Sequence, residues 1–306
     1  MSGEIAFANT ALESFAALVT FVLLFACIAK IKMQRGIKHV TLKEAKRNTL
    51  DYILIIWLVI HMIVLTADVL SWTAMDFGKN EVWLLFMLNL TFTCLSLECM
   101  VYTYYVKETI YQHEKIGNTY VYLVMLSTVI AIILWITSDI SGKFYYLDTQ
   151  GNYTQGSIYW LCQFYCIIVM CGNIVILLKH RKALVRHDVL SLLMYGLIPI
   201  ASIPAQMIWK STTFNLATTL ALIYICISVH MAQYDRIVKQ EKLLIQQEHE
   251  LSMNQMQMMI AQIQPHFLYN SLTALAQLCS KDPKEAKKAI INLSLIHISE
   301  PTRHAQ

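Results

Sequence analysis

Seven long apolar stretches dominate the chain and decide what it can fold into. A bilayer core requires about 20 mostly apolar residues per helix, and seven stretches reach that length. They are residues 10–30, 50–71, 82–106, 119–139, 157–178, 188–208 and 212–230. Because 57% of the residues are hydrophobic and only 14% are charged, the composition excludes a soluble globular enzyme. The sequence predicts an all-α membrane protein in which residues 1–230 form a domain of seven transmembrane helices.

Basic residues set the direction of the predicted spans. The loops after the first, third and fifth spans, together with Lys30 at the end of the first span, hold thirteen Lys and Arg residues, whereas the alternate loops hold three. Positively charged loops remain on the cytoplasmic side of a membrane. The sequence therefore predicts an N-terminus outside the cell and a cytoplasmic C-terminal tail, residues 231–306. The loop 140–156 then lies outside, and its aromatic residues on both sides of Gln150-Gly151-Asn152 predict a small β-hairpin.

Three ionisable side chains fall inside predicted spans, namely His61, Asp68 and Glu98. Buried ionisable groups cost several kcal/mol and mark a functional site or an internal pair. One interpretation is a ligand- or proton-sensing cavity, and the other is polar contact that packs one span on the next. The sequence predicts His61 near mid-membrane, Asp68 toward the outside and Glu98 toward the inside. It does not place the three together, so both interpretations stay open.

The tail begins with a helical pattern free of Gly and Pro over residues 231–264. Ile237, Leu244, Leu251 and Met258 recur every seven residues, and polar Gln or Asn occupies the other seam positions. Sustained heptads favour pairing of two helices, although polar seam positions weaken it. We expect residues 231–260 to form a dimeric stalk. The alternative is an amphipathic helix lying on the membrane surface.

A distinct segment, QIQPHFLYNSL, follows this stalk. Pro265 removes one backbone hydrogen bond and is expected to bend the helix. His266 comes directly after it. A lone histidine on a helix is usually structural, yet neutral imidazole is a competent nucleophile near neutral pH.

A second tail helix is predicted after a short break. Asp282 is a good N-cap, Pro283 suits the first helical position, and Glu285 would complete a capping box. Two helices joined by a short turn form a hairpin. Two chains would then form a four-helix bundle that displays His266.

The motif QIQPHFLYNSLTALAQL resembles the phosphoacceptor region of bacterial LytS/YehU-type sensor histidine kinases. The seven spans resemble, more loosely, the seven-helix sensor regions of some of these kinases. The resemblance implies that ATP phosphorylates His266 and that the phosphoryl group passes to an Asp of a response regulator. Pro265, Phe267 and Asn270 match motif positions. No acidic side chain directly follows His266, so no general base is evident beside it.

The resemblance also implies a domain organisation and partners. Residues 1–230 become the sensor, residues 231–260 the signalling helix, and residues 261–294 an incomplete dimerisation and phosphoacceptor segment. The expected partners are a second copy of the chain, a response regulator, membrane lipid and an unidentified ligand, with no nucleic acid. The expected location is a bacterial inner membrane.

The ATP site itself is not expected within this sequence. Glycine-rich backbone cradles phosphates, and the last glycine is Gly196 inside a span. We therefore expect that the chain is truncated and that ATP and Mg²⁺ bind a further domain that is missing from it. We expect no metal site within the chain itself.

The run LSLIHISEPTR resembles a translated sequencing adapter, so residues 295–306 are expected to be read-through. The rival functions are a non-enzymatic seven-span receptor or scaffold, and a proton-coupled transporter using Asp68 and Glu98.

Overall fold

The computed structural model describes residues 3–35, 42–77, 81–148, 153–209 and 213–299, most of which are helical. The chain divides into two compact units, Met1–Gln233 and Tyr234–Gln306. The division falls inside one helix, α8, so no loop separates the two units.

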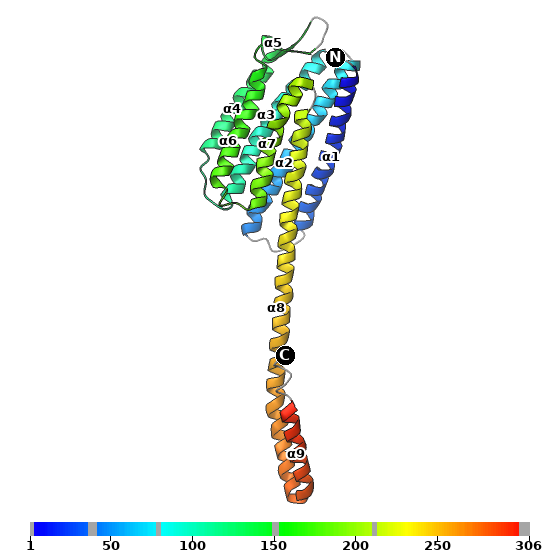
Figure 1. Cartoon of the computed structure of the whole chain (residues 1–306), viewed down its shortest axis with the longest axis vertical. Coiled ribbons are helices and arrows are strands. Elements are labelled where there is room, and N and C mark those ends of the chain that lie inside the picture. The colour runs from blue at the N-terminus through cyan, green and yellow to red at the C-terminus, as the bar shows by residue number, and fades with distance from the viewer. Residues whose placement is uncertain (1–2, 36–41, 78–80, 149–152, 210–212, 300–306) are drawn as a thin grey trace. The chain divides into compact units, whose positions relative to one another are not determined.

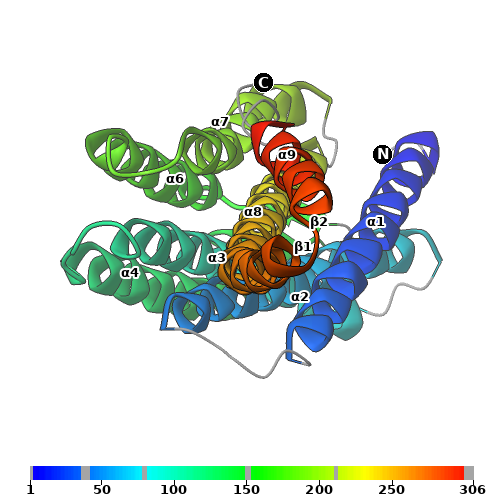
Figure 2. The same cartoon turned by 90° about the horizontal axis from the view of Figure 1, so that it is seen from below.

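The first unit is a helical bundle (Figure 1). Its helices are α1 (Gly3–Arg35), α2 (Leu42–Phe77), α3 (Glu81–Tyr111), α4 (Thr119–Ile136), α5 (Ser138–Ser141), α6 (Trp160–His180), α7 (Arg186–Trp209) and the first part of α8 (Thr213–Lys281). Helix α2 packs along both α1 and α3, α4 packs on α3, and α6 packs on α7. Figure 2 shows the same neighbours from below.

Six helices among the described residues are long and apolar enough to cross a membrane: α1, α2, α3, α4, α7 and α8. They indicate a multi-pass membrane protein. Helix α6 is also apolar, but its described apolar stretch, Phe164–His180, is shorter than the others. Six of the seven predicted spans thus correspond to helices of sufficient length, and the seventh stays a prediction.

An aromatic cluster holds the middle helices of this bundle together. The Trp57 ring of α2 is fully buried, and its centroid lies 5.6 Å from those of Tyr102 and Tyr105 and 4.5 Å from that of Tyr195. The Tyr102 hydroxyl donates a hydrogen bond to the Leu192 carbonyl at 2.9 Å. Since these residues belong to α2, α3 and α7, one cluster fixes three helices.

The predicted hairpin is confirmed at one end of the bundle, which we call the hairpin end. Strand β1 (Tyr145–Leu147) pairs antiparallel with β2 (Tyr153–Gln155), with Tyr146 opposite Thr154. The central turn, Gln150-Gly151-Asn152, lies outside the described residues. Gly142 ends α5 with a φ of 62°, a left-handed conformation that suits glycine and turns the chain into β1. The N-terminal end of α1 lies at this same end of the bundle (Figure 1).

The second unit consists of the remainder of α8 and of α9 (Pro283–Ser299). Helix α8 continues through Pro265, so the expected bend does not interrupt the helix. Helix α9 runs back beside the last part of α8 (Figures 1 and 2). Ala286 of α9 is buried, while Leu275 and Leu278 of α8 are half-buried.

The turn between these helices is capped at Asp282, as predicted. Its Oδ1 accepts hydrogen bonds from the backbone N–H groups of Lys284 at 3.0 Å and Glu285 at 3.3 Å. The expected capping box is wrong in its second half. The Asp282 N–H donates to the Leu278 carbonyl at 2.9 Å, since α8 ends there, and Glu285 instead lies 3.7 Å from Lys288.

Candidate functional site

The first candidate is the exposed face of α8 around His266. The imidazole is exposed, and Asn270 lies one helical turn further along the same face. The Asn270 Nδ2 atom is 3.3 Å from His266 Nδ1 and 3.4 Å from Nε2. The backbone at Pro265 and Phe267 is helical, whereas the side chains of both lie outside the described part of the structure.

This geometry gives Asn270 a direct effect on the imidazole. A neutral imidazole has one nitrogen with a proton and one with a lone pair. An amide N–H that points at the ring occupies the lone pair, through which a neutral imidazole reacts as a nucleophile. After a half-turn of the amide, its oxygen accepts the ring N–H and leaves the lone pair free. Asn270 can therefore set which nitrogen of His266 is able to react.

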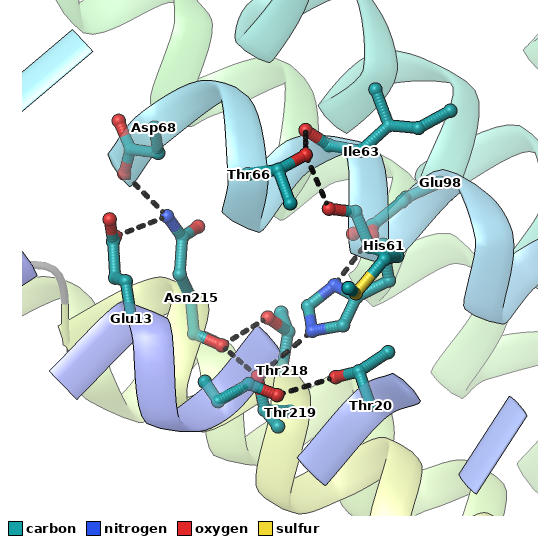
Figure 3. Close-up of polar contacts among 12 residues, drawn as sticks. Glu13, Thr20, His61, Ile63, Thr66, Asp68, Glu98, Asn215, Thr218 and Thr219 are labelled. Atoms are coloured by element: carbon teal, nitrogen blue, oxygen red, sulfur yellow. Dashed lines mark hydrogen bonds and ion pairs between the residues drawn. The ribbon is translucent and has the colours of Figure 1, made fainter. Parts of the chain in front are cut away.

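The second candidate is a buried polar network in the first unit (Figure 3). His61 of α2 is fully buried, and its Nδ1 lies 2.7 Å from Glu98 Oε1 of α3. Its Nε2 lies 2.9 Å from the Thr219 hydroxyl of α8. Both ring nitrogens are thus satisfied, and one imidazole joins three helices.

The network continues toward the hairpin end. The Thr219 hydroxyl donates to the Asn215 carbonyl at 2.8 Å. The Asn215 side chain then donates from Nδ2 to Asp68 Oδ2 at 2.8 Å and to Glu13 Oε1 at 3.0 Å. Helices α1, α2, α3 and α8 all contribute to this chain of hydrogen bonds.

The structure therefore brings together the three ionisable residues that the sequence left apart. His61 and Glu98, for which the sequence predicts different depths in the membrane, are in direct contact. Asp68 joins them through Asn215 and Thr219. Sequence reasoning missed Glu13, although an acidic residue three positions inside the first predicted span is a signal of the same kind as Asp68.

Charges are also paired at the opposite end of the bundle. Lys30 Nζ of α1 lies 2.6 Å from Asp51 Oδ1 of α2, and both side chains are largely buried. Among the described residues, no group of three or more His, Cys, Asp or Glu side chains is arranged to hold a metal ion.

Comparison with known families bears on the first candidate site. Residues 254–298 match the model of a family described as histidine kinase. No curated protein matches the chain. The matched segment contains the end of α8 with His266 and Asn270, the turn at Asp282 and most of α9. The part of the chain that displays the exposed imidazole is therefore similar to a histidine kinase region.

Proposed function

We propose that the chain is the sensor and phosphoacceptor part of a membrane histidine kinase of the LytS/YehU type, with His266 as the phosphorylated residue. The match of residues 254–298 to histidine kinases carries the proposal. The exposure of His266 supports it, because a nucleophile that meets ATP must be reachable from solvent. The six long apolar helices support a sensor in a membrane, for which we propose a bacterial inner membrane with the N-terminus outside.

The proposed reaction transfers the γ-phosphoryl group of ATP. The lone pair of one His266 ring nitrogen attacks the γ-phosphorus, the bond to the bridging oxygen breaks, and ADP leaves with that electron pair. The other ring nitrogen then loses its proton to water. Positioning and charge stabilisation supply most of the catalysis in such reactions. An ATP-binding domain with Mg²⁺, in the same or another polypeptide, would deliver the nucleotide, and an Asp of a response regulator would receive the phosphoryl group.

The stalk part of α8 supports a homodimer. Ile237, Leu244, Leu251 and Met258 are spaced by seven residues, and each exposes more than half of its surface in the single chain. Apolar side chains in a repeated seam are covered when two such helices pair. A second copy of the chain is the proposed partner along this seam, and membrane lipid is the proposed neighbour of the exposed apolar side chains of the first unit.

The decisive test uses membranes that contain the full natural gene product and ATP labelled at the γ-phosphate. We expect an acid-labile label on the wild-type protein and none on a His266→Gln variant. His249→Gln is the matched control, since His249 is also an exposed histidine of α8, and it should keep the label. Equal label on wild type and His266→Gln would overturn the proposal, and an unlabelled wild type would favour a receptor or scaffold.

The dimer is tested separately by disulfide trapping in the same membranes. A Leu244→Cys variant should form a cross-linked dimer under mild oxidation, because the two seam positions face each other. Gln246→Cys, about 200° around the helix from Leu244, should cross-link far less. Similar cross-linking at both positions would argue against a paired seam.

A further inference from the structure

Two carboxyl groups meet near the hairpin end, and only one of them was expected there. Glu13 of α1 is fully buried, and Asp68 of α2 is half-buried. Both accept a hydrogen bond from the same nitrogen, Asn215 Nδ2 (Figure 3). The Glu13 and Asp68 side chains also lie within hydrogen-bonding reach of each other.

A hydrogen bond between two carboxyl groups requires a proton. Ionised carboxylates only accept hydrogen bonds, whereas a protonated carboxyl group donates one. Two adjacent carboxylates in a medium of low dielectric constant repel each other strongly, so such a pair ionises in two separate steps. Within the described part of the chain, the side chains that hydrogen-bond Asp68 are Glu13, Ser71 and Asn215, and none of the three carries a positive charge.

We propose that Glu13 and Asp68 bind a single proton between them and form a proton-sensing site at the hairpin end of the bundle. Asp68 is half-buried, whereas Glu13 is fully buried, so we assign the exchange of the proton to the Asp68 side of the pair. The idea that this site regulates phosphorylation rests on the proposed kinase function, whereas proton binding itself does not.

The Asn9 side chain can donate a hydrogen bond to Glu13 when Glu13 is ionised. Asn9 lies one helical turn before Glu13 on the same buried face of α1 and is 2% exposed, and its Nδ2 has no hydrogen-bond partner among the residues that the structure describes. Side chains of a helix lean toward its N-terminus, so Glu13 leans toward Asn9. When the shared proton leaves, Glu13 can exchange its contact with Asp68 for the Asn9 amide, which gives the site two discrete arrangements.

Each helix around the pair contributes groups that bear on its titration. Helix α1 contributes Glu13 itself, α2 contributes Asp68 and His61, and α3 contributes Glu98. The groups from α8 are the amide of Asn215 and the hydroxyl groups of Thr218 and Thr219, which do not titrate. His61 and Glu98 are in direct contact with each other at 2.7 Å.

The proton-binding site has a direct connection to the proposed phosphoacceptor. Asn215 contacts both carboxyl groups and belongs to α8, the same continuous helix that carries His266. Loss of the proton changes which oxygens Asn215 can hold, and so changes the force that α1 and α2 exert on α8. Regulation of His266 by this site requires only that α8 has two packing states.

Infrared spectroscopy of the whole chain in lipid vesicles tests proton binding without any kinase assay. We expect wild type to show the C=O band of a protonated carboxyl group, and this band should disappear on titration to alkaline pH. Glu13→Gln and Asp68→Asn should each remove the titrating band. Asp51→Asn is the control, since Asp51 is paired with Lys30, and it should retain the band. A wild-type spectrum without such a band, or a band unchanged in both variants, would overturn the proposal.

A second variant keeps the test decisive if loss of a carboxyl group prevents folding. Asn9→Leu keeps both acids but removes the donor for ionised Glu13. A hydrogen bond to a charged group contributes about 1.5–3 kcal/mol, so the proton should bind at least about tenfold more tightly. The titration midpoint would rise by about one pH unit or more. An unchanged or lower midpoint would contradict the proposed exchange of partners.

Labelling by ATP in vesicles of the full natural gene product then tests the link to His266. The label on His266 should depend on the pH at the hairpin end in wild type and lose that dependence in Asp68→Asn. A pH-independent label beside the expected infrared band would overturn the link to His266 while supporting the proton site. Absence of any label would count against the kinase function and leave the infrared result standing.

Discussion

His61 and His266 show how differently the two units of this chain use the same side chain. His61 is fully buried, and both ring nitrogens have partners at 2.7 and 2.9 Å. His266 is exposed, with the Asn270 amide at 3.3 and 3.4 Å. A buried imidazole with two short hydrogen bonds is held in place, whereas an exposed one is free to meet a nucleotide. Burial and hydrogen bonding, rather than residue type, separate a histidine held between helices from one that is open to solvent.

The contrast extends to the helices around them. The first unit fixes its helices through buried aromatic rings and polar bonds between helices, whereas the second exposes most of its side chains. We therefore expect substitutions in the first unit to act on stability and those in the second to act on phosphorylation or pairing.

The largest expected effect is that of Trp57→Ala. Removing a buried Trp typically lowers the free energy of unfolding by about 3–5 kcal/mol, and here the contacts with Tyr102, Tyr105 and Tyr195 are lost. Detergent-induced unfolding followed by circular dichroism measures the change. Leu251→Ala in the exposed stalk is the control and should leave unfolding of the first unit unchanged. Equal effects of the two substitutions would break the contrast between the units.

Substitution of the two histidines sharpens the comparison directly. His61→Ala leaves the Glu98 carboxyl group without its buried partner, whereas Thr219 keeps its bond to the Asn215 carbonyl. An unsatisfied buried polar group costs about 2–3 kcal/mol. His266→Ala removes an exposed side chain and should change the free energy of unfolding by less than about 0.5 kcal/mol. The same unfolding assay measures both. The prediction fails if His266→Ala is the more destabilising of the two.

Loss of the Asp282 cap should have a local effect of about 1 kcal/mol. Asp282→Ala removes the acceptor for two N–H groups at the start of α9, and caps of this kind contribute about 0.5–2 kcal/mol. Hydrogen exchange measured by mass spectrometry should show faster exchange in α9 alone. Lys281→Ala is the neighbouring control. Faster exchange throughout the first unit would show that the effect is not that of a local cap.

The smallest expected effect is that of Asn270→Ala on phosphorylation. When the Asn270 oxygen accepts the ring N–H and leaves the lone pair free, this hydrogen bond contributes about 0.5–1.5 kcal/mol. Its loss corresponds to about a two- to tenfold slower labelling of His266. Thr273→Ala, on the same helix but bonded to the Tyr269 carbonyl, should leave the rate unchanged. A complete loss of label in Asn270→Ala would contradict this prediction, because Asn270 would then do more than position the imidazole.

Much of the fold follows from patterns within single segments. Apolar length predicts the long helices, turn chemistry predicts the hairpin at Tyr145–Leu147, and Asp282-Pro283 predicts the start of α9. These features depend on neighbours in sequence. The capping box failed because the Asp282 N–H was already bonded to Leu278, a partner set by how α8 ends.

The buried network could be predicted only in part. Hydropathy singles out His61, Asp68 and Glu98, because charged groups in apolar spans are conspicuous. Which of them meet depends on how α2, α3 and α8 are rotated about their axes, and an apolar segment gives little sign of its rotation. Asn215 is separated from Asp68 by 147 positions in the chain, so their contact is a property of packing alone.

The boundary between the two units lies within α8, between Gln233 and Tyr234, and this restricts how such a protein can be recombined. A loop at a domain junction tolerates insertions of any length, but a helix rotates everything beyond the insertion by about 100° per added residue. A chimera that joins another membrane unit to this tail therefore has to preserve helical phase. Fusions that add or remove seven residues from the natural length of the helix should keep the seam in its natural direction. Fusions that add or remove two or five residues should rotate the seam away from that direction.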